Sequence, residues 1–182
     1  MTERDIEHWP QETSVARNPT RFVALIALIA VAAPIVPRHA GLTDEDFSLA
    51  RLERVQLRID PFPGSLVDTG LDTEPVRTLW TRRLRAAGIR VVSDTDVPAV
   101  HLKVVGGLDD AVPEGVALSV TVELMQKVHV DRLDESLIVP TYTFVLAALE
   151  TMEKAPVTAD IMMQQQITRF VRKMEKANTT AR

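Results

Sequence analysis

An uninterrupted apolar stretch at residues 22–36, FVALIALIAVAAPIV, constrains this chain more than any other feature. As a helix it would rise only about 22 Å, whereas the hydrocarbon core of a bilayer is about 30 Å thick. Arg21 and Arg38 bracket the stretch, and their long aliphatic stems can extend its reach toward the headgroups. We therefore predict a short membrane anchor. Its apolar side chains include those of Phe22, Leu25, Ile26, Leu28, Ile29, Val31, Ile35 and Val36.

The same stretch also has the length of the apolar region of a cleaved export signal. Ala30, Val31 and Ala32 have the small-x-small spacing that signal peptidase requires, so cleavage after Ala32 would leave Ala33 as the first residue. The leader argues against cleavage, because residues 1–21 carry several acidic side chains where a signal usually starts short and net positive. A third alternative is a helix buried inside the globular part of the chain.

Positive charge near the ends of the apolar stretch weakly predicts its orientation in the membrane. Arg17 and Arg21 lie on its N-terminal side, and Arg38 lies on its C-terminal side. We expect a single-pass protein of the bacterial inner membrane, with the N-terminus in the cytoplasm and the domain in the periplasm. Under the cleavage alternative the chain is a soluble periplasmic protein. The sequence contains no cysteine, which excludes disulfides, thiol catalysis and lipid attachment through a cysteine.

The rest of the chain reads as one domain with short flanking segments. Alternating apolar residues predict strands at residues 55–59, 99–105, 116–130 and 138–149, and helical spacing predicts helices at 73–87 and 158–178. The order β-α-β-β-β-α predicts a two-layer α+β sandwich, in which two helices cover a four-stranded, mainly antiparallel sheet, preceded by an N-terminal hydrophobic helix. The predicted parts are a polar tail at 1–21, the apolar segment at 22–36, a linker at 37–50, the domain at 51–178 and a tail at 179–182.

Three runs in this domain are LWTRRLRAAGIRVV at residues 79–92, AVHLKVVGG at 99–107 and ALSVTVELMQKVHV at 117–130. They resemble a family of small, exported and largely uncharacterised bacterial α+β domains, and the resemblance extends over residues 50–178. It implies an extracytoplasmic location for the domain. Because the matching motifs are structural, the resemblance implies no catalytic residue.

The domain shows no residue pattern typical of an enzyme or a metal site. His101 and His129 stand on separate predicted strands without a second ligand at metal spacing, and no serine lies in a G-x-S-x-G motif. A net charge of -4 and few aromatic residues give no footprint for nucleic acid. We therefore expect no catalytic residue, no cofactor, no metal and no nucleic-acid partner.

Two predicted surfaces remain for interactions. Cations on the last predicted helix, including Arg169 and Arg172, can face water, anionic lipid or an acidic protein surface. The odd-numbered face of the sheet is left to water or a partner, because two helices cannot cover both faces. The candidate interface residues are Val105, Met125, Val139, Val145 and Leu149, together with Trp9 in the tail.

These observations favour a non-enzymatic, membrane-anchored accessory subunit. Its domain would pack on a larger membrane protein complex of the respiratory, photosynthetic, secretion or envelope-transport type. The expected partners are the other subunits of that complex and the lipid bilayer. The alternative is a secreted periplasmic module that binds lipid or peptide after cleavage near Ala32.

Overall fold

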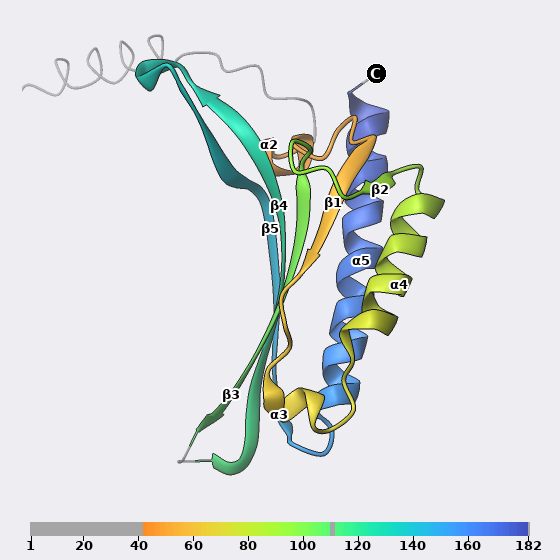
Figure 1. The fold of residues 1–182 in the computed structure, drawn as a ribbon, viewed down its shortest axis with the longest axis vertical. Helices are drawn as coiled ribbons and strands as arrows, with labels where there is room; N and C mark the ends of the chain where they lie inside the picture. The colour runs from red at the N-terminus through yellow and green to blue at the C-terminus, as the bar shows by residue number, and fades with distance from the viewer. Residues whose placement is uncertain (1–41, 110–111, 182) are drawn as a thin grey trace, which may run out of the picture. The chain divides into compact units, whose positions relative to one another are not determined.

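Two long helices lie on the same side of a twisted, five-stranded sheet (Figure 1). This computed structural model of the protein describes residues 42–109 and 112–181, all of which belong to the unit Arg38–Arg182. Within these residues the architecture is the predicted two-layer α+β sandwich, which confirms the fold class.

The sheet contains β1 (Arg54–Ile59), β2 (Arg90–Val92), β3 (Ala99–Asp109), β4 (Val112–Val130) and β5 (Glu135–Thr151), in the order β2-β1-β3-β4-β5. β1 pairs in parallel with β2 and β3, whereas β4 pairs antiparallel with β3 and β5. The prediction of four strands is therefore wrong in its strand count, and it misses the two parallel pairings of β1. β2 has only 3 residues, too few for a period-two pattern to appear.

The two predicted long helices are present. α4 (Thr73–Ala86) is capped by Asp72, whose carboxylate accepts the N–H of Glu74 at 3.1 Å. Gly88 ends the helix with a φ of 84°, a left-handed conformation that glycine adopts without strain. α5 (Ala155–Thr180) begins before the predicted residue 158, because a proline fits the first turn, where its missing N–H needs no partner.

Two short helices are absent from the prediction, α2 (Asp44–Phe47) and α3 (Gly64–Val67). Each has only 4 residues, about one turn, so neither can show a repeating apolar stripe. α2 lies within the predicted linker, yet it is fixed to the domain. Its Asp46 is buried and forms an ion pair with Lys173 of α5 at 2.6 Å.

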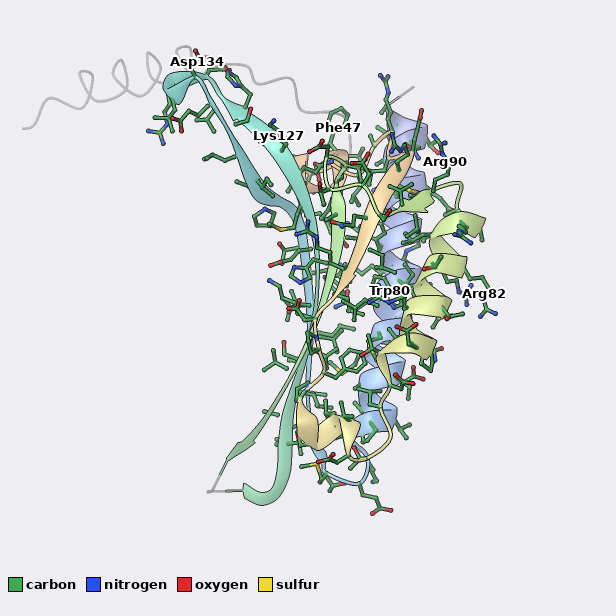
Figure 2. All side chains as sticks on the ribbon, in the orientation of Figure 1. Phe47, Trp80, Arg82, Arg90, Lys127 and Asp134 are labelled. Atoms are coloured by element: carbon green, nitrogen blue, oxygen red, sulfur yellow. The ribbon has the colours of Figure 1, made fainter. Side chains whose placement is uncertain are left out.

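The core lies between the long helices and one face of the sheet. α4 packs on β1 and β2, and α5 packs on β4 and β5. Trp80 points from α4 into this core, whereas Arg82 points away from it (Figure 2). Burial of the even-numbered positions in β4 stops after Leu124, and Val128 is 38% exposed because β3 has no residue paired with β4 beyond Met125. The buried even-numbered residues of β4 are Val116, Leu118, Val120, Val122 and Leu124.

The predicted polar tail with Trp9 and the predicted apolar segment at residues 22–36 lie outside the described residues. Among the residues that are described, no helix combines the length and the apolar character needed to cross a membrane. The membrane anchor therefore stays a prediction.

Trp80 has no exposed surface and is the largest completely buried side chain in the described core. We expect Trp80→Ala to lower the free energy of unfolding by about 3–5 kcal/mol, because it removes a large apolar contact and leaves a cavity. Urea unfolding followed by far-ultraviolet circular dichroism measures this change. Trp80→Phe is the control and should cost clearly less, because it keeps an aromatic ring in the core. Equal losses for the two variants would contradict the prediction.

Tyr142 is the only tyrosine in the chain, so its titration can be followed by ultraviolet absorbance. It is buried against Phe170, with the ring centroids 5.8 Å apart. Burial raises the pKa of its phenol above 10.0, and the charge of Arg169 offsets part of that rise. The titration midpoint should therefore lie above 10.0 and should rise further in Arg169→Gln.

The raised pKa of Tyr142 also links stability to pH. The neutral phenol is favoured by the folded state, so its contribution is complete below pH 10.0 and is lost as the pH rises through the folded pKa. Absorbance titration of the unfolded chain in urea supplies the reference midpoint. A folded midpoint at or below that reference would refute the assignment.

Candidate functional site

The sheet face that points away from α4 and α5 is the candidate functional site, which we name the open face. Strand pairing sets residues of β3, β4 and β5 side by side on it, because directly paired residues point to the same side. Within the described part of the chain, neither long helix contacts this side (Figure 1). The open face consists of the odd-numbered residues of 101–105, 117–125 and 143–149.

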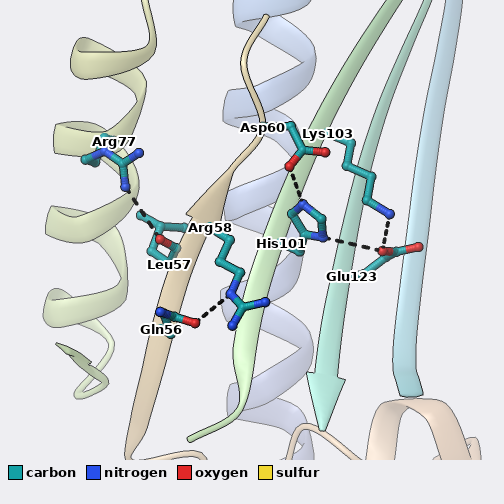
Figure 3. A network of polar contacts seen from close by, with 8 residues as sticks. All are labelled: Gln56, Leu57, Arg58, Asp60, Arg77, His101, Lys103 and Glu123. Atoms are coloured by element: carbon teal, nitrogen blue, oxygen red, sulfur yellow. Dashed lines mark hydrogen bonds and ion pairs between the residues drawn. The ribbon is translucent and has the colours of Figure 1, made fainter. Parts of the chain in front are cut away.

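A row of charged and polar side chains crosses the middle of the open face (Figure 3). Nε2 of His101 lies 2.6 Å from Oδ1 of Asp60, and Nζ of Lys103 donates to Oε2 of Glu123 at 2.7 Å. Nδ1 of His101 lies 3.9 Å from the same Oε2. The side chains of His101 and Glu123 are only 19% and 17% exposed. We name these four residues the polar row.

His101 has no second ligand at metal spacing in the sequence, yet pairing between distant strands supplies it with two carboxylate neighbours. Arg58 of β1 pairs with His101, which places Asp60 just beyond the end of β1 beside the imidazole. Glu123 lies directly opposite His101 on β4. The shared odd numbering of His101, Lys103 and Glu123 is the sequence signal that could have brought three of the four together.

The polar row is suited to the recognition of a partner protein, because its charged groups hold one another in fixed positions. Each carboxylate in it already has a nitrogen partner, at 2.6 Å for Asp60 and 2.7 Å for Glu123. In the described ranges, no group of three or more acidic or histidine side chains is arranged to hold a metal ion. Fixed donors and acceptors on a surface that also exposes apolar side chains can set the orientation of a partner protein.

Three predicted interface residues gather on one side of the polar row. Val105, Val145 and Leu149 are 60%, 50% and 69% exposed. They come from β3 and β5. Strand pairing places Ala117 of β4 beside Leu149, and it places Ser119 of β4 between Val105 and Ala147. We name the whole group the apolar patch: Val105, Ala117, Val145, Ala147 and Leu149.

Met125 and Val139 do not join the apolar patch. Met125 lies on the open face but beyond the polar row, where it is half-buried opposite Pro140. A β-bulge next to Met125 shifts the register of β5, so that Val139 lies opposite Gln126 on the other face of the sheet. Pro140 is the signal for this irregularity, because proline within strands is confined to edges and bulges.

Sequence reasoning also missed an exposed ribbon beyond the bulge. β4 and β5 continue past β3 as two strands alone (Figure 1). Ile138 on this ribbon is 70% exposed, and Leu133 in the turn between the strands is 49% exposed. Ile138 shares a face with the odd-numbered residues of β4 because the bulge exchanges the two faces of β5, whereas Leu133 lies in the turn before β5.

No protein-family model and no curated protein matches the chain. Among solved structures, the minor lipoprotein of Acinetobacter baumannii is similar, with 17% identity, 69% of this chain and 84% of that chain covered, and a TM-score of 0.30. Rare lipoprotein B of Shewanella oneidensis shows 14% identity, 68% and 92% coverage, and a TM-score of 0.33. Structural similarity at this level supports no conclusion about the activity of this chain.

Proposed function

We propose that this protein is a non-enzymatic accessory subunit whose domain binds a partner protein through the open face. The apolar patch carries this proposal, since it presents valine and leucine side chains that are at least 50% exposed. Exposed apolar side chains that gather on one face of a folded domain typically mark an interaction site. The adjoining polar row supplies the fixed charges that give such a site its specificity.

We further propose that residues 22–36 tether the chain to the bacterial inner membrane, with the domain in the periplasm. The support is the apolar stretch itself, which is bracketed by Arg21 and Arg38. A tether keeps the domain at high local concentration near membrane partners, so that a modest surface suffices for stable association. The partner is then another subunit of a membrane protein complex.

A substitution of Val105 tests the open face, because Val105 lies on the inner strand β3 and the change leaves the edge strand β5 unaltered. We expect Val105→Asp to weaken association with the native complex at least about tenfold, or about 1.4 kcal/mol, because it buries a carboxylate without a partner. Blue native electrophoresis of mild detergent extracts from native membranes measures the fraction of chain in the complex. The matched control is Val67→Asp on α3, since Val67 is 50% exposed and lies away from the open face. A similar loss in both variants, or a wild-type chain that migrates alone, would count against the proposal.

The fate of residues 22–36 distinguishes the anchor from its alternative. We expect intact-mass spectrometry of the protein from native membranes to show that these residues are retained. A mature chain that begins at Ala33 would overturn the anchor and favour a secreted module that binds lipid or peptide. Carbonate extraction is the companion measurement, because only an anchored chain stays with the membrane fraction.

A further inference from the structure

β5 is the outer strand on one side of the sheet, so one row of its backbone groups faces no neighbouring strand. α2 covers the start of this edge. The carboxylate of Glu45 accepts the N–H of Thr143 at 2.7 Å, and the hydroxyl of Ser48 donates to the carbonyl of Thr141 at 3.0 Å. These contacts show which backbone groups of β5 point outward.

Alternate residues of a strand direct their backbone groups to the same side. Since the N–H of Thr143 points outward, the N–H and C=O groups of Val145, Ala147 and Leu149 point outward as well. Throughout residues 42–109 and 112–181, none of these outward groups has a hydrogen-bond partner. An edge of this kind can accept another strand.

A groove of about 420 Å³ runs beside this edge, between β5 and α5. Phe144 and Leu146 of β5 and Ile161 of α5 form its apolar lining, and Ile161 is 49% exposed. Arg169 and Arg172 give one end of the groove a positive charge, and the guanidinium of Arg169 lies 3.6 Å from the ring centroid of Phe144. Neither arginine forms an ion pair with any described residue.

The edge of β5 is complementary to itself. If two copies pair antiparallel about Ala147, Val145 of each copy lies opposite Leu149 of the other, and the outward groups of both can bond. On the helix side, Leu146 then meets the other copy's residue 148, and Phe144 meets its residue 150. Residue 150 is Glu150, which forms no ion pair among the described residues and would lie beside the arginines of the groove.

We propose that two copies of this chain associate through their β5 edges, centred on Ala147, to form one continuous sheet. The strand length fits this register, because β5 ends at Thr151, which would lie opposite Thr143, where α2 closes the edge. The position of α5 is also compatible with this pairing. α5 packs over both β4 and β5, and strands lie about 4.8 Å apart, so the two α5 axes come about 10 Å apart, close to ordinary helix contact distance.

Single cysteines test the register, because the chain has none of its own. A cysteine at position 147 would face its own copy across the two-fold axis at about 5.5 Å between Cα atoms, within the range of a disulfide. Mild oxidation of full-length Ala147→Cys in non-ionic detergent should therefore give a cross-linked dimer. Val145→Cys is the matched control and should stay uncrosslinked, because its counterpart lies about 14 Å away. Equal cross-linking of both, or of neither, would overturn the register.

Sedimentation of the full chain in the same detergent tests the association itself. We expect a dimer whose dissociation constant rises at least about tenfold in Ala147→Pro, which removes one outward N–H. Glu150→Arg should have a similar effect, because it would face Arg169 and Arg172 of the other copy. Glu135→Arg is its control, with the same charge change at the exposed, far end of β5. A monomer at all concentrations, or a dimer unaffected by these changes, would refute the proposal.

Discussion

Two helices can bury only one face of this sheet, and the surfaces of the protein follow from that limit. α4 packs on β1 and β2, and α5 packs on β4 and β5, so the buried even-numbered side chains of β4 all point toward one layer. The odd-numbered side chains must then point away from both helices. Core and interaction surface are therefore fixed by the same register, because a shift of one residue would exchange the two faces.

α2 determines how much of the sheet edge stays accessible. The ion pair between the buried Asp46 and the half-buried Lys173 holds this short helix against α5, and Glu45 then closes the edge of β5 at Thr143. A buried ion pair contributes little net stability, but removal of one partner leaves an uncompensated charge, so the pair fixes position more than it adds energy. Beyond Thr143 the edge of β5 is left open.

The sequence predicts the long elements well because burial of one face leaves a periodic pattern in them. The sequence of α4 indicates its N-terminal cap at Asp72 and its end at Gly88. In β4, buried apolar residues occupy the even-numbered positions over many residues. β2, α2 and α3 leave no such pattern, because β2 has only 3 residues and the two helices have 4 each. That length is too short for the repeat of a strand or of a helix to show in the sequence. Elements of that size are specified by the contacts they make, which a local pattern does not contain.

The candidate site was predictable only in part, for a related reason. Val105, Val145 and Leu149 follow from parity, and the structure brings them together. The position of Val139 does not follow from parity, because a bulge beside Pro140 exchanges the faces of the odd-numbered and even-numbered residues of β5. The contact between His101 and Asp60 depends on the parallel pairing of β1 with β3, which no local pattern encodes.

Symmetry joins the two proposed surfaces. A two-fold axis through the paired β5 edges runs normal to the sheet, so the apolar patches of both copies would meet on one continuous open face.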